Sequence, residues 1–462
     1  MKTQLTSLLL ALGLGASAWG QTTWNLEQTV LTEYDLVSGV NIPWELLWGP
    51  DDMLWCTTRH GDVLHIDPIT GAYETVLELD VFGGSGEPGL LGMALHPEWN
   101  TTPKVFLAYT TGTGWSNAAE NLSVFDWNGT SLVNEQVLHT VDAGGIHNGS
   151  RLLVLPDHTL LMTTGDTGDG GTSSQNDNSD NGKVLRFNLD GTVPADNPDP
   201  TSYVFSKGHR NSQGLCLGPN GLIYSSEHGQ SNWDEFNVIE PGRNYGWPNV
   251  EGECNTASEQ TFCDANDVAE PLKTWSPCVA VNGIEYYNHP AIPEWQGSVL
   301  MAVLGGLSGQ YERLSVLHMS EDGLTVESED QLLASFNQRI RDVAVNPYTG
   351  AIYLAFNGPS YPGSGPNLIK EFRPTGTNNV PSVNDRGVEV FPNPATEFLS
   401  LRVGETWSGL AFDVWDVAGA KIAEGTLEDN LRLPLAGWTA GTYILTATGA
   451  GGSTLSRVVL VE

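Results

Sequence analysis

Positive charge is scarce in this chain: lysine and arginine supply 20 of its 462 residues, against 55 aspartates and glutamates, for a formal net charge of −35. Such a balance repels phosphate backbones and anionic lipid headgroups, so it excludes nucleic acids and membrane surfaces as partners. Neutral substrates and cations remain. A strongly acidic, solvated surface also suits a salty habitat, and we favour that simpler interpretation of the charge itself.

Long apolar runs are missing as well. A transmembrane helix needs roughly 20 apolar residues, and no stretch after the start of the chain qualifies, so we expect no membrane insertion. The first 20 residues combine a basic Lys2, an apolar run at Leu8–Leu12 and small residues before Gln21. This is the pattern of a secretory signal peptide. We therefore expect residues 1–20 to be a signal peptide and the mature protein to be exported.

Cysteine is limited to five residues. Cys254, Cys263 and Cys278 fall in one loop-like region of a chain expected to be exported, where disulfides persist. We expect Cys254 to pair with Cys263, and Cys263 with Cys278 is the second choice. Cys56 and Cys216 lie inside apolar strand patterns, which favours small core residues. No cysteine spacing resembles a zinc site.

Amphipathic helix patterns are absent, whereas glycine (53) and proline (26) are plentiful. One phrase recurs instead: an apolar run, a turn that usually contains proline, a second apolar run, a polar turn and a third strand. Four clear copies and two looser ones follow each other along the chain. The clear copies span residues 45–66, 152–187, 214–239 and 342–372, and the looser ones span 91–125 and 283–317.

Six strand-rich units of roughly blade length predict an all-β fold, a six-bladed β-propeller over residues 21–376. One meander cannot bury both of its faces, whereas six packed radially can. A long two-sheet sandwich is the alternative, which the repeat disfavours. A linker rich in Thr, Asn, Pro and Ser follows at 377–387. Short alternating strands over 388–462 then predict a small, separate β-sandwich.

The third unit begins with a hairpin over residues 146–166 that carries polar clusters at one end. His147 enters its first strand and Asp166 leaves its second, so the two side chains can be neighbours. An imidazole beside a carboxylate is an arrangement that orients and strengthens a general base. From the hairpin alone, an ordinary loop histidine is the simpler interpretation.

Propeller ligands bind at one mouth of the central channel, where loops from several blades meet. Polar loops stand out at residues 86–92, 146–166, 207–249 and 338–342. Three of the scarce arginines, Arg210, Arg339 and Arg341, precede strands there. They could clamp a planar anion through bidentate hydrogen bonds and stacking. Structural pairing with the surplus carboxylates explains them about equally well.

Taken together, residues 30–375 resemble the soluble glucose/sorbosone dehydrogenases, quinoproteins that carry pyrroloquinoline quinone (PQQ). Five ordered motifs carry the resemblance. They are His147-Asn148-Gly149-x-Arg151 with Gly165-Asp166, Gly182-Lys183-Val184-Leu185-Arg186, Gly208-His209-Arg210-Asn211-x-Gln213-Gly214, Asn244-Tyr245-Gly246-Trp247-Pro248 and Arg339-x-Arg341-Asp342. The resemblance implies a six-bladed propeller that oxidises the anomeric carbon of an aldose sugar and passes electrons to an external acceptor.

The resemblance also implies roles for individual residues. His147 matches the general base that takes the proton of the C1 hydroxyl, with Asp166 as its carboxylate partner, while hydride passes to the quinone. Arg210 matches the residue that polarises a quinone oxygen. The remaining cofactor contacts match Asn211 and the two carboxylate-binding arginines, Arg339 and Arg341.

Two calcium ions are implied in the same way. Main-chain carbonyls at Gly229 and Gln230 match the ligands of a Ca²⁺ that bridges to the cofactor. Glu235 and Tyr245 match ligands of a second, structural Ca²⁺. Calcium and arginine together make a quinone more electrophilic while the base raises electron density at C1.

Three positions depart from the family pattern. Gln230 replaces a usual proline, which leaves its carbonyl available but less rigidly aimed. Glu87 stands where some members carry a glutamine near the substrate, so the mouth gains a negative charge. A lysine expected to contact PQQ is absent, because the matching stretch reads Val303-Leu304-Gly305-Gly306-Leu307. Arg313 could replace it after a local shift.

The last part of the chain resembles the C-terminal sorting domain of the type IX secretion system. The matching signs are a Phe391-Pro392-Asn393-Pro394 start, an Asp416-Val417-Ala418-Gly419 turn, an Ala440-Gly441-Thr442-Tyr443 hairpin and a basic-apolar end. The resemblance implies the type IX machinery as partner, a secreted or cell-surface location, and no part in the chemistry.

Three functions are compatible with these patterns. The first is a secreted, PQQ- and Ca²⁺-dependent aldose dehydrogenase, which His147 and the arginines favour. The second is a propeller that binds carbohydrate without turnover, which the missing lysine favours. The third is a calcium-dependent propeller lactonase, which a calcium site without an oxidant would mark.

Overall fold

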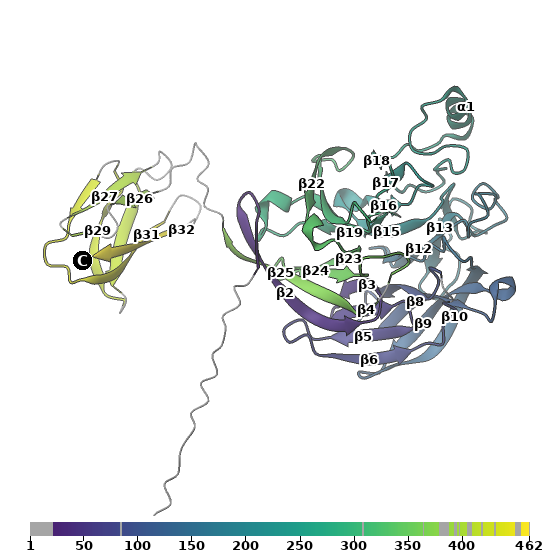
Figure 1. The fold of residues 1–462 in the computed structure, drawn as a ribbon, viewed down its shortest axis with the longest axis horizontal. Coiled ribbons are helices and arrows are strands. Elements are labelled where there is room, and N and C mark those ends of the chain that lie inside the picture. Colours follow the sequence, from purple (N-terminus) through teal and green to yellow (C-terminus); the bar gives the residue numbers. More distant parts are fainter. Residues whose placement is uncertain are drawn as a thin grey trace, which may run out of the picture. The chain divides into compact units, whose positions relative to one another are not determined.

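The computed structural model describes residues 22–83, 86–306, 309–363, 365–377, 388–391, 395–396, 398–403, 409–416, 419–428, 431–448 and 454–461. The chain divides into two compact units, Met1–Thr377 and Asn378–Glu462, and each is described by itself (Figure 1). The predicted signal peptide and residues 378–387 of the predicted linker lie outside the described residues. Within the described ranges, no helix is long and apolar enough to cross a lipid bilayer.

Antiparallel sheets make up the first unit, and its described residues form six of them. In chain order the sheets are β3 (Pro43–Trp48), β4 (Leu54–Thr58), β5 (Asp62–Ile66) and β6 (Tyr73–Glu78); β7 (Leu90–Leu95), β8 (Lys104–Thr111), β9 (Ala119–Trp127) and β10 (Leu132–Asp142); β11 (Leu152–Val154), β12 (Thr159–Thr164), β13 (Lys183–Asn188) and β14 (Val204–Lys207); β15 (Ser212–Leu217), β16 (Ile223–Glu227), β17 (Asp234–Val238) and β18 (Lys273–Trp275); β19 (Val281–Tyr287), β20 (Ser298–Val303), β21 (Arg313–Met319) and β22 (Val326–Leu332); and β23 (Ile340–Val345), β24 (Ile352–Phe356), β25 (Asn367–Thr377), β2 (Thr29–Val40) and β1 (Thr23–Asn25). Single 3₁₀ turns lie at η1 (Trp115–Asn117), η2 (Pro219–Gly221), η3 (Pro293–Trp295) and η4 (Ala334–Phe336). The predicted all-β class is confirmed.

The hydrophobic core of this unit lies between the sheets. A buried apolar cluster joins each sheet to the next one in the chain. Trp55 of the first sheet, for example, packs with Leu107 of the second. A further cluster joins the first sheet to the last, through residues such as Leu46 and Ile369. The sheets therefore form a closed ring in which each one buries both of its faces, as stacked apolar strands require.

Pairing between the two ends of the unit closes this ring. Strand β2 runs antiparallel to β25, from Thr29 opposite Thr377 to Val40 opposite Asn367. The last sheet thus takes strands from both ends of the sequence, and its β23 and β24 come from residues 340–356. The recurring sequence phrase did not reveal this pairing, because the strands that share a sheet with β23 to β25 include β2, which lies about 300 residues earlier in the chain.

Each repeated sequence unit also has a fourth, outer strand that the three-strand phrase missed. The side chains of β22 are half-buried or exposed throughout, and those of β6 are mostly exposed. An outer strand packs few apolar side chains, so it leaves no apolar run in the sequence.

A lobe between β17 and β18 contains the helix α1 (Ala257–Asn266), which the sequence patterns did not predict (Figure 1). Thr256 caps the helix by accepting a hydrogen bond from the Glu259 N–H, and the Glu259 carboxylate accepts one from the Thr256 N–H. Cys263 is the one buried residue of the helix, so the helix has no apolar stripe to pack on the sheets. The capping box stabilises its first turn instead.

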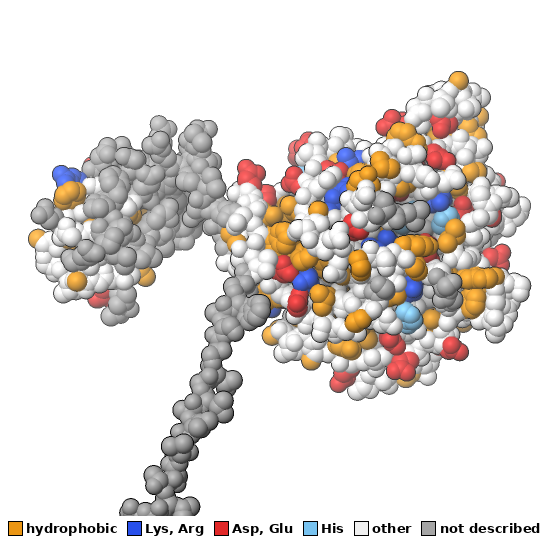
Figure 2. Space-filling model, in the orientation of Figure 1, with side chains coloured by type: hydrophobic (Ala, Val, Ile, Leu, Met, Phe, Trp, Pro, Cys, Tyr) orange, Lys and Arg blue, Asp and Glu red, His pale blue; other side chains and the backbone are white. Residues whose placement is uncertain are grey.

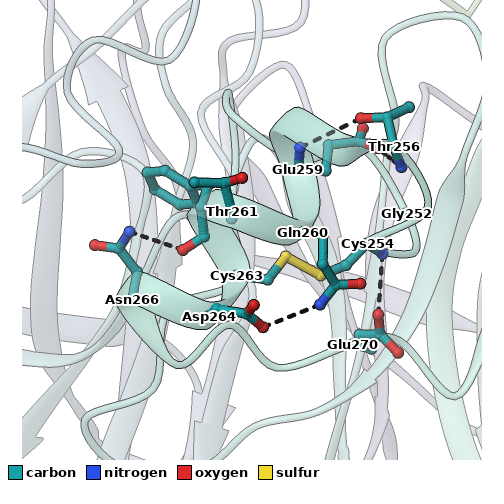
Figure 3. Close-up of a disulfide and its surroundings, with 12 residues drawn as sticks. Gly252, Cys254, Thr256, Glu259, Gln260, Thr261, Cys263, Asp264, Asn266 and Glu270 are labelled. Carbon is teal, nitrogen blue, oxygen red and sulfur yellow. Dashed lines mark hydrogen bonds between the residues drawn. A yellow bond between two sulfur atoms is a disulfide. The ribbon is translucent and has the colours of Figure 1, made fainter.

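The disulfide joins Cys254 to Cys263, which confirms the first-choice pairing (Figure 3). It ties the segment that precedes α1 to the second turn of the helix, while Cys278 keeps a free thiol. Cys56 and Cys216 are buried in the clusters between sheets, as predicted.

The second unit also consists of strands. One sheet contains β26 (Val388–Phe391), β27 (Phe398–Val403) and β30 (Leu431–Pro434), and the other contains β29 (Lys421–Thr426), β28 (Ala411–Asp416), β31 (Gly441–Thr448) and β32 (Thr454–Val461). Side chains from both sheets, including Leu401 and Leu445, share one buried cluster. Residues 392–394 and 417–418 of the expected sorting motifs lie outside the described residues.

Acidic side chains are scattered over the face of the molecule in view in Figure 2 rather than gathered in one patch. This distribution fits a solvated acidic surface.

Because the two units have separate cores, we expect the second to be dispensable for folding of the first. A chain that ends at Thr377 should unfold at the same temperature as the first unit of the full chain, as scanning calorimetry would measure. The ring is already closed at that residue, since Thr377 is the last residue paired with β2. A truncated chain that aggregates or lacks a cooperative transition would contradict this division.

Candidate active site

A cavity of about 520 Å³ opens at one end of the first unit. Its lining comes from segments that precede the first strand of a sheet or follow the second strand, which are the same end of an antiparallel pair. The sequence-predicted residues that line it are Glu87, His147, Arg210, Gly229, Gln230, Arg339 and Arg341. Segments of four of the six sheets contribute to this set, so distant parts of the sequence meet in one cavity.

His147 faces the cavity and is held from behind. Its Nδ1 lies 2.7 Å from Oδ1 of Asp166, and its backbone N–H donates to Glu87 at 3.1 Å. The hairpin pairing of β11 with β12 brings these two sequence-predicted residues together. Since Nδ1–H donates to the carboxylate, the neutral imidazole has an unprotonated Nε2, which is the basic atom left for a ligand.

Asp166 is buried, and its carboxylate accepts two further hydrogen bonds. Gly168 N–H donates to its Oδ1 at 2.8 Å and Trp247 Nε1–H donates to its Oδ2 at 2.9 Å. Burial alone would raise the pKa of Asp166, but these bonds and the bond from His147 outweigh it and hold the pKa below its usual value. The carboxylate therefore stays ionised and stabilises positive charge on the imidazole.

Arg210 also contacts Trp247, because its guanidinium lies over the indole ring, 5.4 Å from the centroid. Its Nη1 donates to the carbonyl of His228 at 3.1 Å, while its Nε is buried without a hydrogen-bond partner. Buried Glu227 fixes the local backbone, because it accepts the N–H groups of Arg210 and Asn211. The arginine is thus positioned with an open donor.

Asn211 does not line the cavity; it lies behind the lining. Its Oδ1 accepts the N–H of Gly149 at 3.2 Å, and its buried Nδ2 has no partner. The structure thus gives it a contact to the loop that follows His147, and one donor that a ligand could use.

Arg339 and Arg341 are 4% and 7% exposed, although neither pairs with a carboxylate by an ion pair within the described residues. Arg339 donates to the carbonyls of Leu304 and Gly306 at 3.2 and 3.4 Å, and its Nε is unpaired. Burial lowers the pKa of Arg339, and burial with the charge of Arg339 lowers that of Arg341 to about 9. A bound anion would relieve both effects, so the pair suits an anionic ligand.

The rim of the cavity carries Glu87, Tyr361 and Arg59. Tyr361 donates its hydroxyl to Glu87 at 3.1 Å, and Arg59 donates to the carbonyl of Pro362 at 2.8 Å. Burial lowers the pKa of Arg59, and the nearby Glu87 opposes that shift. The sequence patterns had singled out only Glu87 here, because Arg59 begins an ordinary turn after β4 and belongs to no recognisable polar cluster.

Arg313 does not replace the missing lysine, so this alternative was wrong. Its guanidinium donates to Ser315 at 2.9 Å and to Glu329 at 3.0 Å, and it does not line the cavity. Side chains alternate along a strand, and Arg313 begins β21 on the face turned to Glu329. The fourth arginine in the cavity is Arg59 instead.

The main-chain carbonyls of Gly229 and Gln230 accept no hydrogen bond from any described residue. Asp234 holds their loop by accepting the Gly229 N–H at 2.9 Å and the N–H groups of Val279 and Ala280. Two free carbonyl oxygens at the cavity wall fit a hard cation such as Ca²⁺. Among the described residues, there is no cluster of three or more His, Cys, Asp or Glu side chains that could hold a metal.

Glu235 and Tyr245 lie around a second, much smaller cavity that also contacts Arg210 and Gly229. Burial raises the pKa of Glu235 to about 8, and the charge of Glu227 adds to the shift. A cation beside Glu235 would reverse it. The Tyr245 hydroxyl is already engaged, since it donates to Val238 at 2.5 Å and accepts from Glu240 at 2.9 Å. Only the main-chain carbonyl of Tyr245 is then open to a metal.

A buried ion network adjoins the cavity. Arg151 pairs with Glu45 and, at 3.1 Å, with Asp342, and its Nε donates to the Gln213 carbonyl at 2.8 Å. The guanidinium lies 4.5 Å from the ring centroid of Trp44, which lines the cavity. Burial raises the pKa of both Glu45 and Asp342 although Arg151 lowers each. Segments of four sheets are joined here, the first, third, fourth and sixth.

Sequence reasoning did not assign Trp44, Gln213 or Trp247 to the site. Trp247 and Gln213 lie within recognised motifs, but the motifs do not show their partners. In the structure, Trp247 donates to Asp166, and Gln213 accepts a hydrogen bond from Arg341 at 2.9 Å. Trp44 lies in an apolar strand pattern, where nothing distinguishes it from a core residue.

Comparison with known proteins adds two families and several relatives. A family described as glucose/sorbosone dehydrogenase matches residues 40–361, and one described as a secretion system C-terminal sorting domain matches residues 389–462. An uncharacterised protein of Synechocystis sp. is 36% identical over 350 residues, covering 69% of this chain and 82% of that protein. Quinoprotein glucose dehydrogenase B of Acinetobacter calcoaceticus is 34% identical over 249 residues, covering 47% of this chain and 52% of that enzyme. The PQQ-bound aldose sugar dehydrogenase of Streptomyces coelicolor superposes with a TM-score of 0.63 at 30% identity, covering 74% of this chain and 96% of the other.

The buried network predicts a large, pH-dependent loss in Arg151→Met. Removing the cation leaves Glu45 and Asp342 buried without compensation, which should lower the free energy of unfolding by about 3–5 kcal/mol near neutral pH. Burial then raises the pKa values of Glu45 and Asp342 in the folded state above those in the unfolded state. The loss of unfolding free energy should therefore shrink in acid and grow as the pH rises. Denaturant titrations between pH 5 and 8 would measure it.

Lys104→Met is the matched control. Lys104 pairs with Asp126 at 2.5 Å, but their side chains are 37% and 41% exposed. Such a pair is worth less than about 1 kcal/mol. Equal losses in the two variants would contradict a special role for the buried network.

Proposed function

The chain belongs to the glucose/sorbosone dehydrogenase family, and from this premise we propose that it oxidises the C1 hydroxyl of an aldose sugar to a lactone, with PQQ as the electron-accepting cofactor. One observation carries the proposal. A single cavity contains an imidazole with a free Nε2, backed by an ionised carboxylate, together with Arg210 and Arg339, whose buried Nε–H groups lack partners.

We infer that the closed ring of sheets is a six-bladed β-propeller and that the second unit is a small β-sandwich. The support is the set of apolar clusters between successive sheets, including the one between the last sheet and the first. In this arrangement the cavity occupies one mouth of the central channel, and the Arg151 network fills the channel next to it.

The residues present fit PQQ, a planar molecule with three carboxylates and an ortho-quinone. Arg339 and Arg341 would bind carboxylates, because both are buried cations without an anionic partner in the described residues. Arg210 would donate to a quinone oxygen, and its unpaired Nε and that of Arg339 are the open donors. The bound quinone supplies a two-electron acceptor for the hydride that leaves C1.

His147 would perform the proton transfer. Its Nε2 accepts the proton of the C1 hydroxyl, which turns the ring into an imidazolium, and the ionised Asp166 stabilises that charge at Nδ1. Trp247 keeps the carboxylate in place from the other side. Glu87 and the Tyr361 hydroxyl then remain at the rim to bind other hydroxyls of the sugar.

Ca²⁺ would bind at the carbonyls of Gly229 and Gln230, and a second Ca²⁺ at Glu235 and the carbonyl of Tyr245. The support is the absence of other hydrogen bonds to the first two carbonyls in the described residues, and the raised pKa of Glu235. The ions would be released by chelation, since neither site encloses a metal with many carboxylates.

The C-terminal unit would direct export, because it matches the secretion sorting family. We propose a secreted or cell-surface location, reached through the signal peptide and the type IX machinery, with the electrons passed to an external acceptor.

The main test is cofactor reconstitution. Cofactor-free protein with Ca²⁺ should take up one PQQ per chain and reduce an artificial dye when an aldose is added. Thorough chelation should abolish dye reduction and added Ca²⁺ should restore it, while a chelator already saturated with Ca²⁺ serves as control. Failure to bind PQQ would favour carbohydrate binding or lactone hydrolysis, and activity indifferent to chelation would remove the roles of Gly229, Gln230, Glu235 and Tyr245.

The role of His147 has its own test. His147→Ala should keep PQQ affinity, because the arginines hold the cofactor, but its rate per bound PQQ should fall by about 10²–10⁴-fold. Asp166→Asn should lose less, since Asp166 acts through the imidazole. His158→Ala is the control, because this half-exposed histidine lies at the far end of the same hairpin. An undiminished rate per bound PQQ in His147→Ala would end the catalytic assignment.

A further inference from the structure

The mouth of the cavity exposes apolar side chains that a soluble protein normally buries. Trp115 is 50% exposed, Tyr361 44% and Ile146 38%. Tyr361 and Ile146 line the cavity itself, whereas Trp115 stands just outside it. Large exposed apolar groups that gather at one place mark a binding surface, and here that surface continues outward from the candidate active site.

Trp115 lies on a hydrogen-bonded turn and packs against a second aromatic ring, although it is half exposed. It begins the single turn η1, which is braced because Asn117 accepts the Thr113 N–H at 3.1 Å and donates to the Thr113 hydroxyl at 3.1 Å. Its ring meets Phe82 edge to face, with 4.7 Å between centroids. A side chain fixed in this way loses little entropy when a ligand covers it.

Gly145 lies between Trp115 and the cavity-lining residues Ile146 and His147. The outer edge of its indole lies 3.6 Å from the position that a Cβ of Gly145 would take. The Gly145 carbonyl accepts the N–H of Glu87 at 3.3 Å, and Ile146 and His147 follow in the chain. Gly145 and His147 are two residues apart, so their Cα atoms are separated by at most about 7.6 Å.

We propose that Trp115 is the platform that packs on the second ring of a disaccharide substrate, and so sets the preference for disaccharides over single sugars. The proposal rests on the proposed function. If C1 of the reacting ring lies at Nε2 of His147, the rest of a sugar chain must leave through the mouth, past Glu87 and Ile146. The next ring then lies over Gly145 and packs its C–H face on the exposed indole, whose π-face attracts polarised C–H groups.

Selective kinetics test the platform. In protein loaded with PQQ and Ca²⁺, Trp115→Ala should lower kcat/KM for cellobiose or maltose by about 5–10-fold, the effect of losing one aromatic contact. The value for glucose should stay within about 2-fold, because a single ring does not reach Trp115. Trp115→Phe should recover most of the disaccharide rate. Tyr73→Ala, which removes an aromatic side chain that is 43% exposed on β6, is the control.

Two results would overturn the proposal: equal losses for glucose and both disaccharides, or no loss for any of them. A wild-type protein that oxidises no sugar would instead refute the proposed function. The platform can then still be measured by calorimetric binding of methyl β-cellobioside and methyl β-maltoside, which lack a free C1 hydroxyl. Binding that Trp115→Ala leaves unchanged, or no binding, would refute the platform by itself.

Discussion

Pairing between β2 and β25 is the constraint on which the site depends. It joins residues 29–40 to residues 367–377 and so places the last sheet against the first. Without that contact, Arg339 and Arg341 would have no fixed relation to Trp44, since they lie about 300 residues apart in the chain. Long-range antiparallel pairing is slow to form, because the chain loses the entropy of closing the loop before the stabilising contacts are made. Once formed, it holds the last sheet against the first and so closes the ring.

The buried ion network around Arg151 links the packing of the sheets to the position of a side chain in the cavity. Arg151 binds Glu45 of the first sheet, Asp342 of the last and the Gln213 carbonyl of the fourth. Gln213 in turn accepts Arg341, whose guanidinium faces the cavity. A buried cation shared by two carboxylates is weak support for stability but a strong constraint on register. Arg341 is therefore positioned through Gln213 by the buried ion network behind the cavity.

The sequence predicts the features that have local periodicity. Apolar runs and proline turns gave the inner strands, and paired polar clusters on one hairpin brought His147 to Asp166. Contacts between segments far apart in the chain carry no such signal. Trp247 reaches Asp166 across 81 residues, and Arg59 enters the cavity from a turn of ordinary appearance. The outer strands and α1 were missed for a different reason, because they bury too few apolar residues to leave a period.

The uneven distribution of charge explains how an acidic protein can select an anion. Four of its 20 basic residues, Arg59, Arg210, Arg339 and Arg341, line one cavity in a chain of net charge −35. The surface carboxylates act through water and salt, where charges are screened beyond about 8 Å. Arg339 and Arg341 are buried and Arg59 and Arg210 are half-buried, so their field inside the cavity is screened much less. A small anion that fits within 520 Å³ is attracted once it enters, whereas a polymeric anion meets only the repelling exterior. Unpaired N–H groups on buried arginines are costly in a folded chain, and their retention at Arg210 and Arg339 is what a site built around a bound anion requires.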